Sequence, residues 1–131
     1  MGGSDFRPSA TRRGREAESI SASYLEEQGI ALLSRNYRGP VGEIDIVGID
    51  SGVICFIEVR SRQSSAFIHP IETISPVKQR RIIKTAVAFL MQEYDGRFQT
   101  YPCRFDVVVL IVPILGLPKI TWIKDAFRLP G

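Results

Sequence analysis

Apolar residues recur at helical spacing in two stretches of the chain. The first covers residues 11–28 and stops at Gly29, a residue type that commonly ends helices. The second begins after Ser75, a good N-cap, has Pro76 at the first helical position and runs to Gly96. Each stretch therefore predicts an amphipathic helix with one face on a core. The apolar positions are Ala17, Ile20, Tyr24 and Leu25 in the first stretch, and Ile82, Ile83, Ala86, Val87, Leu90, Met91 and Tyr94 in the second.

Four other stretches have the patterns of strands. Residues 30–38 predict a strand that ends in a Gly39-Pro40 turn, and residues 42–60 predict a β-hairpin. Residues 103–112 are rich in β-branched residues and too apolar for an exposed edge, which favours the interior of a sheet, whereas residues 119–127 alternate. The order α-β-β-β-α-β-β predicts an α/β fold, in which a mixed sheet begins as a meander, continues after a helical crossover and is flanked by helices. We expect residues 1–10 to form a flexible arm and residues 11–131 a single domain.

The predicted hairpin places two acids in an apolar setting. A two-residue loop at Ser51-Gly52 makes residue 50 face residue 53, so that Asp45 lies opposite Glu58. A three-residue loop would mix charged and apolar positions on both faces, and a bulge at Gly48 would also change the register. In the favoured register one face carries Val47, Ile49, Ile54 and Phe56, and the reverse face carries Ile44, Ile46, Ile57 and Val59.

Opposed carboxylates on a buried ladder repel each other, and burial keeps water from screening them. A basic neighbour, a shared proton or a bound cation must compensate. Mg²⁺ or Mn²⁺ is the hard cation that carboxylate oxygens favour. The alternative for Asp45 and Glu58 is a purely structural ion-pair network with Arg35, Arg60 or Arg62.

A third acid borders the apolar face of the first helix. Glu18, Ala22 and Leu25 follow i, i+4, i+7 spacing, so Glu18 is expected to reach the same pocket as the hairpin acids. The alternative is a surface glutamate that pairs with Arg12 or Arg15.

Three other residues suggest structural roles. Asp106 follows Arg104 by two positions, and an ion pair with Arg104 or with a basic helix is a simpler interpretation than support of the acidic pocket. Trp122 lies in an alternating apolar strand, which favours a place in the core over a platform for stacking bases.

The chain carries a net charge of +3 and a pI near 9.1, and its positive residues are clustered. Such clusters suit a polyanion such as nucleic acid, although a solvated helix face explains a single cluster equally well. No stretch approaches the roughly 20 apolar residues of a membrane span, and no apolar leader begins the chain, so we expect a cytoplasmic protein without membrane contact. The clusters are Arg7, Arg12, Arg13 and Arg15, and then Lys78, Arg80, Arg81 and Lys84.

The spacing of Asp45, Glu58 and Arg60 resembles the Asp-x(n)-(Asp/Glu)-x-Lys pattern of the restriction-endonuclease-like superfamily. A longer series of segments resembles the YraN-like family of uncharacterised bacterial proteins, whose nearest relatives of suggested function are archaeal Holliday-junction resolvases. This likeness covers roughly residues 12–127. Its segments are "GREAESISASYLEEQGIALLSRNYRGPVGEIDIVGIDSGVICFIEVRSR", "SPVKQRRI", "RFDVVVL" and "ITWIKDAF".

The resemblance implies a restriction-endonuclease-like fold and a metal-dependent nuclease that acts on DNA, including branched or irregular DNA. Glu18, Asp45 and Glu58 match the metal-binding acids, and Arg60 stands where the superfamily usually has lysine. Arginine stabilises charge but does not give up its proton, so a non-catalytic nucleic-acid-binding protein is the alternative. The resemblance is compatible with a homodimer but does not require one. The expected phosphate contacts are Lys78, Gln79, Arg81, Lys84, Arg62, Arg12 and Arg13.

Overall fold

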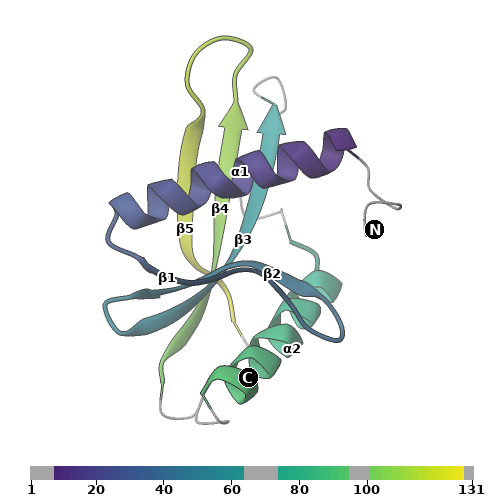
Figure 1. Cartoon of the computed structure of the whole chain (residues 1–131), viewed down its shortest axis with the longest axis vertical. Coiled ribbons are helices and arrows are strands. Elements are labelled where there is room, and N and C mark those ends of the chain that lie inside the picture. Colours follow the sequence, from purple (N-terminus) through teal and green to yellow (C-terminus); the bar gives the residue numbers. More distant parts are fainter. Residues whose placement is uncertain (1–7, 64–73, 95–100, 129–131) are drawn as a thin grey trace.

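The computed structural model describes residues 8–63, 74–94 and 101–128, with side chains from residue 14 onward. It contains one five-stranded sheet and two helices in the predicted order (Figure 1). The first helix begins at Pro8, within the stretch predicted as an arm, and the second ends at Glu93. The elements are α1 (Pro8–Glu27), β1 (Ala31–Arg38), β2 (Glu43–Asp50), β3 (Val53–Gln63), α2 (Pro76–Glu93), β4 (Cys103–Val112) and β5 (Lys119–Phe127).

The strands follow one another across the sheet in chain order. Neighbouring strands are antiparallel except β3 and β4, which are parallel and are joined through α2. This arrangement confirms the predicted mixed sheet with a meander and a helical crossover. Strand β4 lies between β3 and β5 and is buried from Phe105 to Leu110, which explains its continuous apolar sequence.

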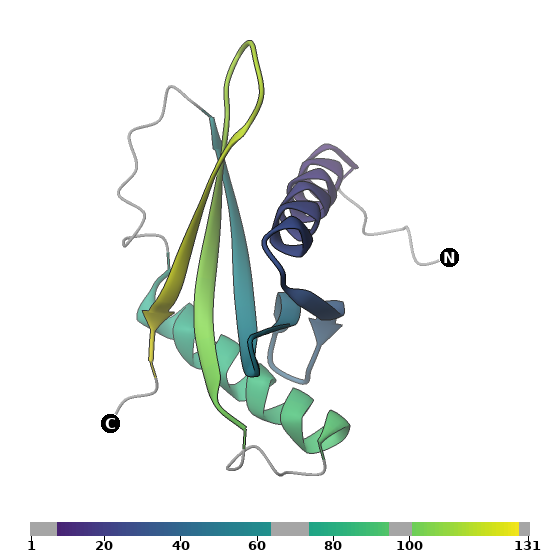
Figure 2. The ribbon, with the colours of Figure 1, turned by 90° about the vertical axis from the view of Figure 1, so that its left-hand side faces the viewer.

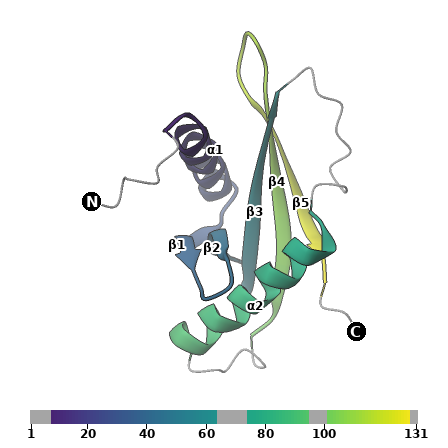
Figure 3. The ribbon, with the colours of Figure 1, turned by 90° about the vertical axis from the view of Figure 1, so that its right-hand side faces the viewer.

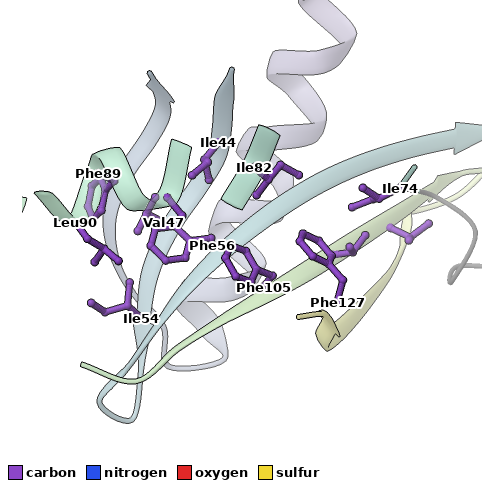
Figure 4. Packing of buried hydrophobic residues seen from close by; sticks show 13 residues of the cluster. Ile44, Val47, Ile54, Phe56, Ile74, Ile82, Phe89, Leu90, Phe105 and Phe127 are labelled. Carbon is purple, nitrogen blue, oxygen red and sulfur yellow. The ribbon is translucent and has the colours of Figure 1, made fainter. Parts of the chain in front are cut away.

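Helices α1 and α2 pack on opposite faces of the sheet, each over its own apolar cluster (Figures 2 and 3). Leu25 of α1 packs with Ile46 and Ile57. On the α2 side, the Phe56 and Phe105 rings stack with centroids 5.5 Å apart (Figure 4). In the described part of the chain neither helix is long and apolar enough to cross a membrane.

The buried face of α2 differs in part from the predicted stripe. Phe89 and Thr85 are buried, whereas Val87 and Met91 are exposed. The Phe89 ring packs edge-on against Phe56 and against a strand β1 tyrosine, with centroids 5.9 and 5.1 Å apart. The large Phe89 ring therefore faces the sheet, and the helix is rotated about its axis relative to the orientation that the predicted stripe implied.

The hairpin register is as predicted. Ser51 and Gly52 both have positive φ, 51° and 85°, as a two-residue type I′ turn requires. The pairing runs from Asp50↔Val53 to Ile46↔Ile57 without a bulge at Gly48. An irregularity occurs instead in β1, where the pairing with β2 shifts between Leu32 and Ser34.

The ladder between β2 and β3 ends earlier than the register predicts. The last paired residues are Ile46 and Ile57, so Asp45 and Glu58 are not ladder partners. Ile44 correspondingly packs in the α2-side cluster together with Val47, rather than on the reverse face with Ile46. The strands separate here because a side chain takes over one of the backbone hydrogen bonds, as described below.

Gly48 lies under the chain that leads from α1 into β1. A Cβ atom at this position would lie 2.5 Å from Ile30 Cγ2 and 3.1 Å from the Ala31 carbonyl oxygen. We therefore expect Gly48→Ala to lower the free energy of unfolding by about 1–3 kcal/mol through overpacking, measured by urea denaturation. Gly14→Ala is the matched control, because its Cβ meets open space in a helix and should be neutral or slightly stabilising. Equal stability of the two variants would contradict the tight packing at Gly48.

Candidate acidic site

Asp45 takes the place of a backbone acceptor at the point where β2 and β3 separate. Its Oδ2 accepts a hydrogen bond of 2.8 Å from the Val59 amide. In a regular continuation of the ladder, that amide would donate to the Ile44 carbonyl. The carboxylate therefore satisfies the β3 backbone while β2 leaves the sheet, and it is held at a fixed place beside β3.

The surroundings of Asp45 are acidic. Burial raises the pKa of the Asp45 carboxyl from 3.8 to about 7, and the charges of Glu58 and then Glu18 add to the increase, as does a hydrogen bond with the Glu58 side chain. The Val59 amide acts in the opposite direction. Among the described residues Asp45 has no cationic partner within salt-bridge distance. A proton or a cation would relieve this accumulation of negative charge.

Glu58 is buried on the α2 side of β3, with 6% of its surface exposed. Lys78 Nζ lies 2.9 Å from its Oε2, and Arg60 Nε lies 3.6 Å from the same oxygen. The Arg60 Nε atom is itself buried and has no hydrogen-bond acceptor among the described residues. The ion pair with Arg60 was among the predicted alternatives. The pair with Lys78 was not, because the sequence does not specify where the α2 N-terminus lies relative to β3.

Glu18 lies on the face of α1 that docks on the sheet, as its spacing predicted, and is only 4% exposed. The predicted surface pairing is therefore not its environment. Arg35 donates to Glu18 Oε1 from Nε and Nη2, at 3.1 and 3.0 Å. Asn36 Nδ2 donates to the same oxygen at 2.8 Å. Asn36 has a positive φ of 54°, a conformation that asparagine adopts more readily than most residues. The presence of an asparagine within a predicted strand is therefore the sequence signal that could have identified this position.

A pocket of about 520 Å³ opens between α1 and the separated strands. Glu18 and Asp45 both line it, whereas Glu58 lies on the α2 side and reaches Asp45 through the gap between β2 and β3. Within the described residues, no three acidic, histidine or cysteine side chains form a ready-made metal-ligand group. The remaining lining residues are Gly14, Arg15, Ala17, Asn36, Arg38, Glu43, Val59 and Ser61.

The predicted phosphate-binding residues have different environments. Lys78 is engaged by Glu58, and the Gln79 side chain donates to the Ile74 carbonyl. Arg81 and Lys84 are exposed on α2. The Arg62 guanidinium donates to the Ser61 carbonyl at 2.9 Å. Arg12 and Arg13 fall within α1, and their side chains are outside the described part of the structure.

Asp106 forms a separate, neutralised site. Arg104 Nε donates to both of its oxygens, at 3.0 and 3.1 Å, which confirms the predicted ion pair. Trp122 Nε1 and the Asp125 amide also donate to it, at 3.0 and 2.9 Å. The partly buried Trp122 ring packs against Arg104 and Lys124, so this strand residue has the structural place that its pattern predicted.

Together, the fold and the acidic pocket define the class: a mixed α/β protein with buried carboxyl groups at the point where two central strands separate. The uncharacterised protein family UPF0102 matches residues 17–110, so the chain belongs to this family. UPF0102 proteins of Coxiella burnetii (strain RSA 493 / Nine Mile phase I) and Nitrosococcus oceani are 43% and 40% identical over 115 and 124 residues. These matches cover 88% and 94% of this chain, and 91% and 98% of the relatives.

A third relative, the UPF0102 protein of Pseudomonas putida, is 40% identical over 120 residues, with 92% of this chain and 95% of the relative covered. These matches confirm the resemblance to a family of uncharacterised bacterial proteins. The part of the chain that the family matches contains Glu18, Asp45, Glu58, Arg60 and Lys78.

The raised pKa of Asp45 predicts a specific pH dependence of stability. The folded state holds a proton that the unfolded state, with its ordinary pKa of 3.8, releases. The stabilisation is complete below pH 3.8 and is lost as pH rises to about 7. In buffer without divalent cations, we expect Asp45→Asn to become more stable than the wild type by about 2–4 kcal/mol at pH 8, because asparagine stays neutral. Urea unfolding of both proteins from pH 4 to pH 8 measures the difference.

Glu93→Gln is the matched control for this measurement, because it removes one exposed carboxylate at the end of α2. Its stability should follow that of the wild type across the whole range. A constant difference between wild type and Asp45→Asn from pH 4 to pH 8 would show that Asp45 is not held in the surroundings described above.

Proposed function

We propose that this protein is a metal-dependent nuclease that acts on DNA in the cytoplasm, including branched or irregular DNA. The observation that carries the proposal is the half-buried Asp45 carboxyl group beside the buried acid Glu58, with Asp45 unpaired by any cation among the described residues. Hydrolysis of a phosphodiester is a reaction in which adjacent carboxylates and a divalent cation work together.

A hard divalent cation such as Mg²⁺ or Mn²⁺ is the proposed ion of this site, with two neighbouring carboxylates as its first ligands. Asp45 and Glu58 supply adjacent carboxylate oxygens, the donors that these ions prefer. Glu18 faces the same pocket as Asp45 and is proposed as a third ligand through Oε2, since Arg35 and Asn36 bind Oε1. Such an ion, when bound, would activate a water molecule and stabilise the charge on the phosphate.

The basic residues of the site would act directly on the DNA phosphate. Arg60 has a buried Nε donor without an acceptor, beside Glu58, and is proposed to donate to a phosphate oxygen. Because arginine does not lose its proton, Arg60 stabilises charge and does not act as a base. Lys78, already paired with Glu58, limits the repulsion between that acid and the phosphate. Arg81 and Lys84 would hold the DNA backbone along α2.

Metal binding and cleavage test the proposal together. We expect the wild type to bind Mn²⁺ in calorimetry and to cleave at least one of four substrates: single-stranded, duplex, flap or four-way DNA. Asp45→Asn should lose the metal binding and slow cleavage by about a hundredfold or more, because a ligand is removed. Glu93→Gln should retain both. Folded wild-type protein that binds no metal in the presence of DNA and cleaves none of the four substrates would refute the nuclease.

A non-catalytic nucleic-acid-binding protein is the second candidate. The ion pairs of Lys78 and Arg60 with Glu58 favour it, since they supply part of the charge that a metal would otherwise supply. Arg60 in place of the superfamily's usual lysine favours it as well.

Salt-dependent DNA binding distinguishes the two candidates. Both predict that Lys84→Ala weakens binding and lowers the slope of log K against log salt by about 1, measured by fluorescence anisotropy of labelled duplex. Val87→Ala, at an exposed apolar position on the same helix, should leave the slope unchanged. The binding-only candidate further predicts that affinity is independent of Mn²⁺ and survives Asp45→Asn and Glu58→Gln. Affinity that rises with Mn²⁺ in the wild type alone excludes this candidate.

A further inference from the structure

The connection between β4 and β5 carries an apolar tip whose large side chains are exposed. Figures 1 and 2 show it projecting beyond the end of the sheet. Ile114, Leu115 and Leu117 are 90%, 87% and 89% exposed. Large apolar side chains at this exposure, adjacent in sequence and in space, mark an interaction site.

The tip is also stiff and set among positive charges. Pro113 and Pro118 restrict the backbone on either side of it, and Gly116 makes its turn with a φ of 100°. At its base, Ile111 of β4 pairs with Arg62 of β3 on one side and with Lys119 of β5 on the other. Residues 110–122 contain no aspartate or glutamate.

We propose that the tip formed by Ile114, Leu115 and Leu117 is a wedge that inserts between bases of DNA at a branch point. Proteins that distort DNA insert leucine, isoleucine or proline between base steps while neighbouring cations hold the phosphates. Here Arg62 and Lys119 lie at the base of the wedge, on either side of Ile111, and supply the neighbouring positive charge. Unstacking costs least where pairing is already interrupted, which selects branched over continuous duplex.

The position of the tip is consistent with the proposed nuclease, on which this inference rests. Glu58 is level with Val107 of β4, and Ile114 lies seven residues further along the chain, two residues beyond the end of that strand. The separation is therefore at most about 23 Å at roughly 3.3 Å per residue. This corresponds to no more than about seven base-pair steps, at 3.4 Å each, between the inserted wedge and the phosphate at the acidic site.

A protein partner fits these observations less well. A stable protein interface buries roughly 800 Å² per partner, and the tip offers three large apolar side chains toward such an area. A second copy of the chain would also bring a second set of cations against Arg62 and Lys119. DNA satisfies both the apolar tip and its charged base.

The test is base unstacking at the branch of a four-way junction that carries 2-aminopurine beside the crossover. We expect wild-type protein in EDTA, and Asp45→Asn with Mg²⁺, to raise the fluorescence severalfold at the branch and not within a continuous duplex. The triple variant Ile114→Ser, Leu115→Ser, Leu117→Ser should abolish this increase and bind the junction about tenfold more weakly, the loss of about 1.4 kcal/mol. The exposure of the three side chains means that its thermal stability should not change.

Val87→Ser, Met91→Ser is the matched control, because it removes exposed apolar side chains from α2 and should unstack the junction as the wild type does. An unchanged fluorescence increase in the triple variant overturns the wedge. The wedge is also overturned if the triple substitution converts a wild-type dimer to a monomer, or abolishes binding to anionic vesicles, while the variant still unstacks the junction.

The failures of the two proposals are distinguishable. Protein that unstacks the junction but neither binds Mn²⁺ nor cleaves supports the wedge and refutes the nuclease. A triple variant that unstacks and cleaves the junction as well as the wild type refutes the wedge alone. Protein that binds no DNA at low salt refutes both.

Discussion

The hydrogen bond from the Val59 amide to the Asp45 carboxylate determines where the pairing of β2 with β3 ends and the acidic pocket begins. A β-ladder continues only while each backbone amide meets a backbone carbonyl. Here a carboxylate replaces the carbonyl. The pairing of β2 with β3 therefore ends at Ile46, and the Val59 amide is not left without an acceptor. At this point Asp45 feels the negative charges of Glu58 and of Glu18, which come from opposite sides of the sheet. The pocket under α1 and the contact with Glu58 under α2 thus have one common origin.

The charges around this gap are distributed unevenly. Glu18 is held by Arg35 and Asn36, and Glu58 is held by Lys78 at 2.9 Å with Arg60 nearby. Asp45, between them, has one amide donor and two negative neighbours. The fold therefore balances the outer acids and concentrates the unfavourable electrostatics on the central one. Departures of this kind from local consistency are typical of functional sites, where strain is retained because it serves binding or chemistry.

The sequence predicted those features that depend on repeated local patterns. Ser51-Gly52 defines the turn, and the apolar pairs on both faces specify the register as far as Ile46. The end of the ladder was not predictable, because it depends on one bond between a side chain and a backbone amide, which has no periodic signature. The rotation of α2 was missed for a related reason. Phe89 and Val87 are both apolar, and only the contact with the Phe56 ring decides which of them is buried.

Asp106 shows why the position of Asp45 alone does not make it a functional acid. Both aspartates lie where a strand pairing is interrupted, and both accept a backbone amide, from Asp125 and from Val59 respectively. Asp106, fully buried, also accepts hydrogen bonds from Arg104 and Trp122, so its charge is matched. Asp45 has no such donors beyond the amide in the described part of the chain, and it faces Glu58 instead. The same backbone arrangement therefore gives a structural acid where donors surround it and a candidate ligand where acids do. The number and sign of the neighbours, rather than burial, distinguish the two.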